Sequence, residues 1–441
     1  MSLLYESALF LFKNRLYRDL KSSLKISHED RQEILKLQNN KFVRLIDHAR
    51  INVPYYSQIL KNLRDIDDLA GIPFLTKKII KEKADDLKTK NLKEKDFRKN
   101  STSGSTGETM YFYSDMNNTY AEACAIRGDM FSGWNYGEKK ITIWGALRDF
   151  HDKPGFKARI NQKYLQKSEI LSSFNMTEKD IDHYIDFINN FKPSLLIGYP
   201  TGLLLIAEHM IKYNRKITVP LTLVSAGETL YDFQREIIEK VFGHGVFNRY
   251  GCREVIQIAS ECEAHNGLHI SADHLIAEVV NEKGEPASPG EAGEIIVTDL
   301  DNYAFPFIRY KIGDIGILKD PDYRCSCGVN LPMLERVEGR TMDVIVGTNG
   351  NRVTGTFWTL FFRHNFKGIE KFQVIQETSN QINIWFEINE SYNNRDNETI
   401  INEIKKLLGD DLQIEIHVVD EISKTATGKH RWIISKVSPY A

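Results

Sequence analysis

The chain has 441 residues, of which 41% are apolar and 27% charged, a composition typical of a folded protein with two or three lobes. Its 58 Lys and Arg residues nearly balance its 60 Asp and Glu residues, which excludes the global charge field that attracts nucleic acid or an anionic membrane. No apolar run approaches the roughly 18 residues that span a bilayer. Five cysteines are few and odd in number, so we expect no disulfide framework and a cytoplasmic protein.

Residues 1–95 have helical character, beginning with an amphipathic helix. In the stretch EILKLQNNKFVRLIDHARINV, apolar side chains recur every three to four positions, as in a helix that buries one face. These side chains are Leu35, Leu37, Phe42, Leu45 and Ile46. Pro54 and Pro73 end the helical stretches locally.

Residues 96–339 form the predicted large core, and from about residue 140 strands alternate with helices. The short apolar runs ITIWGAL, SLLIGYP and LTLVSAGE favour strands, and TGLLLIAEHMIKY and REIIEKVFG favour the helices between them. This alternation predicts an α/β core with parallel pairing, followed over residues 270–320 by an antiparallel hairpin. Residues 340–441 are expected to form a small, mobile α+β domain with a hairpin, a helix and a last strand.

The stretch STSGSTGETM, residues 101–110, could wrap a polyphosphate, because glycine allows close approach and the backbone amides donate hydrogen bonds. Glu108 stands where a P-loop requires lysine, which excludes a Walker-type NTPase. Alone, the stretch is equally compatible with a polar surface turn. Other motifs follow it in a fixed order: SAGE at 225–228, YGCRE at 250–254, RYKIGD at 309–314, GRTMD at 339–343 and KTATGKHR at 424–431.

Together these motifs resemble the adenylate-forming superfamily of acyl-CoA synthetases and adenylation domains. The stretches KFVRLIDHARINVPYYSQIL and IPFLTKK, with the YGCRE variant, are similar to the phenylacetate–CoA ligase-like family and its capsular polysaccharide biosynthesis branch. The resemblance implies that ATP activates a carboxylic acid as an acyl-adenylate, with release of pyrophosphate. The acceptor would then be CoA, a carrier thiol or an amine.

The resemblance also implies roles for individual residues. The pyrophosphate would be wrapped by Thr102, Ser103, Gly104, Ser105, Thr106 and Gly107. The wall against the adenine would consist of Ala226, Gly227, Glu228, Tyr250, Gly251 and Cys252. Glu254 would bind Mg²⁺, which prefers carboxylate oxygen, and Asp314 would accept hydrogen bonds from both ribose hydroxyls. Arg340 would lie near the ribose or the α-phosphate.

Lys429 is the predicted catalytic cation, which would lie between the α-phosphate and the attacking carboxylate and stabilise both anions. Thr106 and Glu254 are the other residues expected to act in catalysis. Relatives commonly have a hinge aspartate two places after the arginine of GRTMD, where this chain has Met342, with Asp343 one place later. The domain rotation that the resemblance implies is therefore a weaker expectation than adenylation.

The acyl pocket is expected near Trp134, Trp144, Gly145, Tyr199 and the strand before Gly227. The segment ITIWGALRDFHDKPGF differs from the aryl-acid ligase pattern and favours the capsular branch, which implies activation of a carboxylate or amino acid for attachment to a sugar. Two alternatives remain. A CoA-independent amide synthetase is consistent with all of these motifs, and an inactive structural relative is consistent with Glu108 and Met342, which depart from the family pattern.

Cysteine spacing predicts a second site with zinc. Cys262, Cys325 and Cys327, with one histidine, would give a closed tetrahedral set and hence a structural role. Both His265 and His269 are candidates, and zinc-bearing relatives favour the second because they carry a histidine in this position. The alternative is a set of free thiols. Cys124 is expected to be buried as packing.

Overall fold

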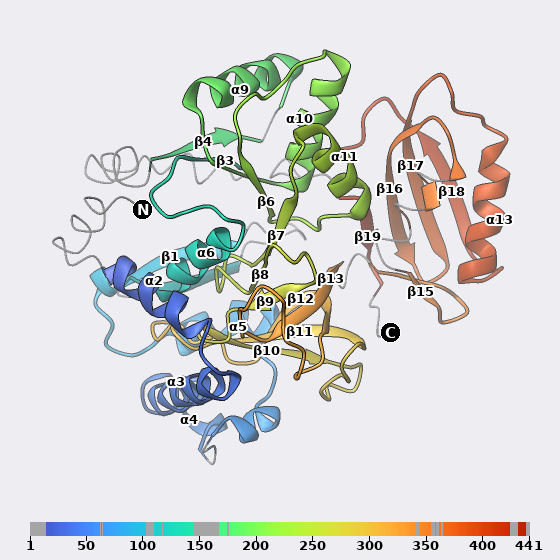
Figure 1. Cartoon of the computed structure of the whole chain (residues 1–441). Coiled ribbons are helices and arrows are strands. Elements are labelled where there is room, and N and C mark those ends of the chain that lie inside the picture. The colour runs from blue at the N-terminus through green and yellow to red at the C-terminus, as the bar shows by residue number, and fades with distance from the viewer. Residues whose placement is uncertain are drawn as a thin grey trace.

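The computed structural model describes most of the chain in two lobes (Figure 1). The described residues are 15–61, 63, 65–102, 110–116, 118–144, 167–173, 176–340, 344–353, 358, 361–362, 365–423 and 431–437. Statements below concern these residues.

Helices dominate the first part of the chain. They are α2 Arg15–Ile26, α3 Arg31–Asn52, α4 Tyr56–Ile59, η1 Ile66–Gly71, α5 Lys77–Leu87 and η2 Glu94–Asp96. Helix α3 buries Phe42, Leu45 and Ile46, which confirms the predicted helix. At its start the buried residue is Ile34, whereas the predicted Leu35 is exposed. The helix ends two residues before Pro54, as the sequence predicts, because proline disfavours the helical conformation of the residue before it.

An antiparallel hairpin follows these helices, with strands β1 Phe97–Thr102 and β2 Met110–Asp115. Thr102 pairs with Met110, so the STSGSTGETM stretch begins at the end of one strand and finishes at the start of the other. The sequence analysis did not predict this hairpin.

The centre of the large lobe is an eleven-stranded sheet, and one half of it is parallel. The parallel strands lie in the order β7-β6-β5-β3-β4. They are β3 Lys140–Trp144, β4 Ser168–Ser172, β5 Leu195–Gly198, β6 Thr222–Ala226 and β7 Val246–Tyr250. The predicted α/β core is therefore confirmed, although β4 was not foreseen.

Helices cover both faces of the parallel half. Leu195, Ile197 and Val224 pack in one core cluster with residues of α2 and of α6 Tyr120–Met130. On the other face, Leu196 and Leu223 pack with residues of α9, α10 and α11. These helices are α9 Glu178–Phe191, α10 Pro200–Lys212 and α11 Asp232–Phe242. Because both faces are covered, the central strands β5 and β6 are buried along nearly their whole length.

The other half of the sheet is antiparallel. Its strands are β8 Ala259–Glu261, β9 Leu268–Ile270, β10 Leu275–Val280, β11 Ala292–Asp299, β12 Tyr310–Leu318 and β13 Met333–Arg340. Strands β10 and β11 pair as the antiparallel hairpin that the sequence predicts over residues 270–320.

The C-terminal lobe has a second sheet, in the order β18-β17-β16-β19, with a two-stranded pair beside it. Its elements are β14 Ile345–Val346, β15 Arg352–Val353, β16 Ile369–Thr378, β17 Gln381–Ile388, α13 Asp396–Leu408, β18 Gln413–Val418 and β19 Ile433–Ser435. The predicted hairpin, helix and strand are confirmed as β16–β17, α13 and β18, but β18 is not the last strand, because β19 follows it and pairs with β16. Figure 1 shows this lobe beside α11, and Trp432 lies edge-on to Phe233 of α11 at 5.9 Å between ring centroids.

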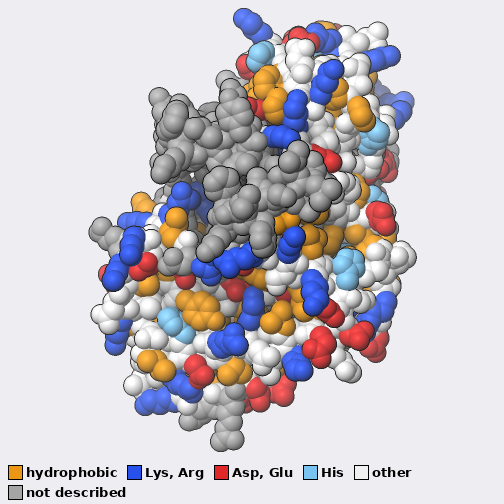
Figure 2. All heavy atoms as spheres, turned by 60° about the vertical axis from the view of Figure 1, so that its left-hand side comes forward, with side chains coloured by type: hydrophobic (Ala, Val, Ile, Leu, Met, Phe, Trp, Pro, Cys, Tyr) orange, Lys and Arg blue, Asp and Glu red, His pale blue; other side chains and the backbone are white. Residues whose placement is uncertain are grey.

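The surface agrees with the balanced composition. Figure 2 shows Lys and Arg side chains interspersed with Asp and Glu on one face of the molecule. Among the described helices, none combines the length and the hydropathy required to cross a bilayer.

Candidate active site and metal centre

The candidate nucleotide site lies where the parallel strands end. Because β3, β5, β6 and β7 run in the same direction, their carboxyl ends share one edge of the sheet, and β4 ends there as well. The chain leaves β3 for β4 on one side and later returns to β5 on the other, so the strand order reverses between β3 and β5. Ligands of open α/β sheets bind at such a reversal.

An aromatic pair stands at this point. Trp144 ends β3, Tyr199 follows β5, and their ring centroids are 4.5 Å apart. Gly227, which follows β6, is exposed beside them with φ +79°. A Cβ at this position would lie 2.6 Å from Tyr199 Cε1 and 3.2 Å from Trp144 Cη2. The SAGE glycine therefore keeps the edge of the sheet open, because a side chain would clash with the aromatic pair.

The side chain of Glu228 turns away from solvent, toward the start of α10. Its Oε2 accepts hydrogen bonds from the Thr201 hydroxyl at 2.7 Å and from the Thr201 backbone amide at 3.3 Å. The carboxylate thus lies at the N-terminus of a helix, where negative charge is favoured. Ala226, the last residue of β6, is buried, so of the three wall residues predicted in the SAGE motif only Gly227 is exposed.

Tyr250 and Asp314 join the two halves of the sheet. The Tyr250 hydroxyl at the end of β7 donates to Asp314 Oδ2 of β12 at 2.8 Å. Asp314 is the cross-strand partner of Arg340 in the β12–β13 pair. The fold therefore brings Asp314, the predicted ribose ligand, next to Tyr250 of the predicted adenine wall. It also places Asp314 opposite the backbone of Arg340. The Arg340 side chain lies outside the described part.

Glu254 is buried, at 6% exposure, and its Oε1 accepts a 2.7 Å hydrogen bond from the Tyr310 hydroxyl. Burial raises the pKa of Tyr310, and the Glu254 carboxylate raises it further, so the phenol remains a donor. Tyr310 stands in the RYKIGD motif, yet the sequence analysis assigned it no role. The RYKIGD motif could have indicated this role, because Tyr310 stands in it four residues before Asp314.

Two further residues of the YGCRE motif shape the turn after β7. A Cβ at Gly251 would lie 2.1 Å from the Ile256 carbonyl oxygen, so this position requires glycine. Cys252 packs against the core cluster that includes Val255, Ile258 and Tyr310, and burial raises the pKa of its thiol. The cysteine is consequently a neutral packing group in the wall.

Several predicted residues lie outside the described part of the chain. They are Ser103, Gly104, Ser105, Thr106, Gly107, Gly145, Met342, Asp343 and Lys429. Thr102 is described only as the last residue of β1. Their roles stay predictions.

Trp134 is buried at 2% exposure in a core cluster that also contains Ala226, and Trp144 packs against the same cluster. The Lys140 ammonium, at the start of β3, lies 5.3 Å from the centroid of its ring. Buried aromatic residues usually serve as packing, and a place for Trp134 in an acyl pocket stays a prediction.

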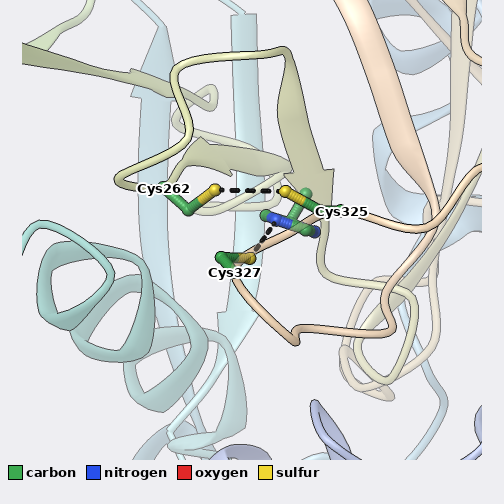
Figure 3. A group of neighbouring side chains, drawn as sticks. Cys262, Cys325 and Cys327 are labelled. Carbon is green, nitrogen blue, oxygen red and sulfur yellow. Dashed lines mark hydrogen bonds between the residues drawn. The ribbon is translucent and has the colours of Figure 1, made fainter.

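The predicted zinc residues come together between β8, β9 and the β12–β13 connection. Ligand atoms of Cys262, His269, Cys325 and Cys327 all lie within 4.8 Å of one another. Cys262 Sγ is 3.6 Å from Cys325 Sγ, and Cys327 Sγ is 3.3 Å from His269 Nε2. Figure 3 shows the three thiols turned toward a common centre.

These distances fit a tetrahedral zinc ion. Zinc–sulfur bonds of about 2.3 Å place two sulfurs roughly 3.7 Å apart, whereas a disulfide would need about 2.05 Å. Burial lowers the pKa of His269 to about 4, so its ring is neutral and able to ligate. Burial also raises the pKa of Cys262 and Cys327, and a divalent cation would reverse this by binding the thiolates.

His265 faces away from this cluster. Its Nδ1 lies 3.4 Å from both Arg235 Nη1 and Glu261 Oε1, and its ring contacts Phe247. The geometry therefore selects His269 from the two histidines that the spacing left open.

The cluster is tied to the N-terminal helices. Arg31 of α3 donates to the carbonyls of Asn330 and Leu331 at 2.5 and 3.2 Å, and Asn330 N donates to Ser27 O at 2.8 Å. The Cys325–Cys327 turn thus connects the antiparallel half of the sheet to α2 and α3, which favours a structural role for a bound metal.

Comparison with known proteins agrees with this architecture. Over 425 residues the chain is 25% identical to Protein CapK of Staphylococcus aureus, covering 92% of this chain and 90% of the relative. It is 26% identical to phenylacetate-coenzyme A ligase of Aromatoleum evansii over 73% of each chain. Residues 345–436 match the family described as the CapK C-terminal domain. The chain is thus similar to CapK over nearly its whole length and to a phenylacetate–CoA ligase over about three quarters of it, and its C-terminal lobe matches the CapK C-terminal domain.

A solved structure supports the fold of both lobes. The chain matches 2-hydroxyisobutyryl-CoA ligase, in the postadenylation state with R3-HIB-AMP, at a TM-score of 0.72 and 17% identity. The match covers 93% of this chain and 91% of that ligase. At this identity the match shows the fold, and it includes the second, smaller sheet.

Proposed function

We propose that this protein activates a carboxylic acid with ATP as an acyl-adenylate, releases pyrophosphate, and transfers the acyl group to CoA or another acceptor. The observation that carries this proposal is the joining of Gly227, Tyr250, Asp314 and Glu254 at one edge of the sheet. Gly227 comes from SAGE, Tyr250 and Glu254 from YGCRE, and Asp314 from RYKIGD, and the Tyr250–Asp314 hydrogen bond connects the last two motifs.

The binding roles follow from the chemistry of each side chain. Gly227 leaves a flat, open wall beside Tyr199 and Trp144 that an adenine or a small acyl group can approach. Asp314 has two acceptor oxygens, which suit the vicinal ribose hydroxyls, and the Tyr250 bond fixes their orientation. Tyr310 holds one oxygen of Glu254, and we assign the other to Mg²⁺, a hard cation. When bound, Mg²⁺ would screen the phosphate charges.

The chemical step needs a cation between two anions. We assign this role to Lys429, with Thr102, Ser103, Gly104, Ser105, Thr106 and Gly107 donating to the leaving pyrophosphate. Residues 340–441 would then form a small domain that rotates after adenylation, so that Lys429 leaves and the acceptor enters. The contact between Trp432 and Phe233 supports a present arrangement in which the lobe that carries Lys429 lies against the large lobe.

The names of the relatives suggest in which process the proposed activity takes part. A place in capsule or surface polysaccharide synthesis rests on the name of Protein CapK at 25% identity. The segment after Trp144 departs from the aryl-acid ligase pattern. We therefore favour a small hydroxy acid or an amino acid over phenylacetate as the substrate.

Pyrophosphate release across a library of carboxylic and amino acids, with and without CoA, tests the proposal. We expect release with at least one acid and formation of a thioester when CoA is present. Hydroxylamine-trappable adenylate with no thioester would favour the CoA-independent amide synthetase. If no acid gives release in the presence of Mg²⁺ and ATP, the proposal is wrong and the inactive relative is favoured.

A further inference from the structure

His274 is a buried histidine just before β10, and both of its ring nitrogens meet acceptors. Its side chain has 0% exposure. Nε2 lies 3.0 Å from the Val255 carbonyl oxygen, and Nδ1 lies 2.9 Å from Asp301 Oδ2. A carbonyl and a carboxylate oxygen can only accept, so both nitrogens donate and the ring is an imidazolium.

The carbonyl that His274 holds belongs to an unusual turn. Val255 O also accepts from Gln257 N at 2.8 Å, a hydrogen bond that skips only Ile256. Ile256 has φ +65°, in the left-handed region that a β-branched residue rarely enters. Such three-residue turns with positive φ are rare and strained. The turn therefore needs support from its surroundings.

This turn directly follows Glu254 and packs against the loop that precedes it. Ile256 N donates to Cys252 O at 2.7 Å, and Ile258 N donates to Tyr250 O at 3.0 Å. The Ile256 carbonyl occupies the space in which a Cβ at Gly251 would lie. A shift of the turn would consequently move Glu254 relative to Tyr310.

We propose that His274 is a positioning residue that clamps the Val255–Gln257 turn and thereby fixes Glu254 for its cation. The inference rests on the proposed function only for the identity of that cation. The imidazolium gives the Val255 carbonyl a charge-assisted donor, which is stronger than a neutral one. A strained turn near a functional carboxylate persists only where contacts from the surrounding structure hold it in place. His274 supplies such a contact.

The other end of the clamp is anchored. Asp301 accepts from Lys41 Nζ at 2.9 and 3.0 Å, and its backbone amide donates to Asp299 Oδ1 at 2.9 Å. Leu300 N donates to the His274 carbonyl at 3.0 Å. The side chain of Asp273 is fixed by two 2.8 Å bonds from Arg127. Helix α3, helix α6 and the end of β11 thus hold the histidine from three directions.

His274→Gln tests the clamp, with His48→Gln as a matched control. His48 Nε2 also lies 3.0 Å from a backbone carbonyl, that of Tyr303, but it makes no contact with the Glu254 turn. We expect His274→Gln to speed amide hydrogen exchange over residues 250–258 by about tenfold. It should also raise the Mg²⁺ concentration for half-maximal pyrophosphate release by about tenfold, the usual effect of losing a group that orients a metal ligand.

In the same variant, the Kd of AMP should change by less than about threefold, because Asp314 lies on β12 and not on the turn. His48→Gln should leave the exchange over residues 250–258 and the Mg²⁺ requirement unchanged. Equal effects of the two variants, or a folded His274→Gln protein with wild-type exchange and Mg²⁺ requirement, would overturn the proposal.

Asp301→Asn is the second variant, in case His274→Gln does not fold. The amide oxygen still accepts from Nδ1, but it no longer favours the imidazolium, so a smaller acceleration over residues 250–258 is expected. No acceleration would count against the clamp. Hydrogen exchange needs no substrate, so a wild type that forms no adenylate would refute the proposed function while the test of His274 still stands.

Discussion

The zinc-type cluster and the nucleotide site differ in how their residues are brought together. In the cluster, ligand atoms of four side chains lie within 4.8 Å of one another, on short strands and a turn that α3 holds in place. In the nucleotide site, Gly227 follows β6, Tyr250 and Glu254 end and follow β7, and Asp314 lies on β12. Tyr250 donates a hydrogen bond to Asp314, and Glu254 accepts one from Tyr310. One site is closed by protein groups, whereas the other leaves positions for a ligand.

The difference teaches which kind of contact each site depends on. A closed tetrahedral set gains its free energy from a bound metal, so removing ligands should affect the fold. An open site presents groups whose energy is realised when the nucleotide binds or reacts, so changing one of them should affect affinity or rate. Variants in the two regions should therefore separate stability from activity.

Loss of the cluster should have the largest effect. We expect the double variant Cys325→Ser with Cys327→Ser to lose its zinc and about 4 kcal/mol or more of the free energy of unfolding, because two ligands of a structural metal are removed. Elemental analysis and denaturant unfolding measure these quantities. His265→Gln is the control and should keep a full equivalent of zinc. Gently purified wild type with well under one zinc per chain would contradict the assignment.

Lys429→Ala should leave the fold intact and lower the rate of acyl-adenylate formation by about a hundredfold or more, near 3 kcal/mol of transition-state stabilisation. Pyrophosphate release with saturating ATP and acid measures this rate. Lys436→Ala is a matched control in the same lobe, because Lys436 is half-exposed and pairs with Glu377. A Lys429→Ala rate equal to that of the control would remove the lysine from the mechanism.

Local patterns in the sequence predicted many of the residues in both sites. The apolar strands β3, β5 and β6 and the motifs that follow them are short and contiguous, so the sequence alone places their residues at strand ends. The cysteines and His269 likewise stand close to turns. The sequence could not distinguish His269 from His265 as the ligand, because the spacing does not show that the His265 ring lies beside Arg235 and Glu261.

Long-range contacts were the part that the sequence could not predict. Arg127 and Asp273 form a buried ion pair across 146 residues, and His274 reaches back to Val255 across 19. Neither contact has a local pattern, since each depends on how α6 and the sheet pack. The sequence did not indicate the β1–β2 hairpin. The last residues of β1, NST, continue into a polar stretch that has no alternating pattern.

His274 contacts the turn that follows Glu254, and its ionisation should make stability depend on pH. Burial lowers its pKa, but the carboxylates of Asp299 and Asp301 outweigh burial and raise the pKa to about 8 from 6.5. Lys41 faces the same site through Asp301. The folded state binds the proton more tightly than the unfolded state, so this stabilisation is complete below about pH 6.5 and is lost as the pH rises through about 8.

The expected loss is on the order of 2 kcal/mol, from the shift between the two pKa values. Denaturant unfolding at a series of pH values between 6 and 9 measures it, and the His274→Gln protein should lack this part of the slope. A wild-type curve that is flat over this range, or an unchanged slope in the variant, would show that the imidazolium contributes nothing to stability.

Tyr250→Phe should have the smallest effect and gives the finest test of the open site. The substitution removes the 2.8 Å hydrogen bond to Asp314 and keeps the aromatic face. Because the carboxylate is half-exposed, water replaces the lost donor, and only the orientation of the two oxygens suffers. We expect the Kd of AMP to rise by about fivefold, near 1 kcal/mol, as for a single hydrogen bond to a charged group that solvent can substitute.

Calorimetric titration with AMP measures this change, and Tyr323→Phe is the matched control, since its hydroxyl accepts from Asn266 beside the metal cluster. The control should bind AMP as the wild type does. A loss of a hundredfold in Tyr250→Phe would mean that the phenol contacts the nucleotide directly, because the bond to Asp314 cannot supply so much. An unchanged Kd would place the ribose away from Asp314, and the open site would then have to be built around the aromatic pair at the ends of β3 and β5 instead.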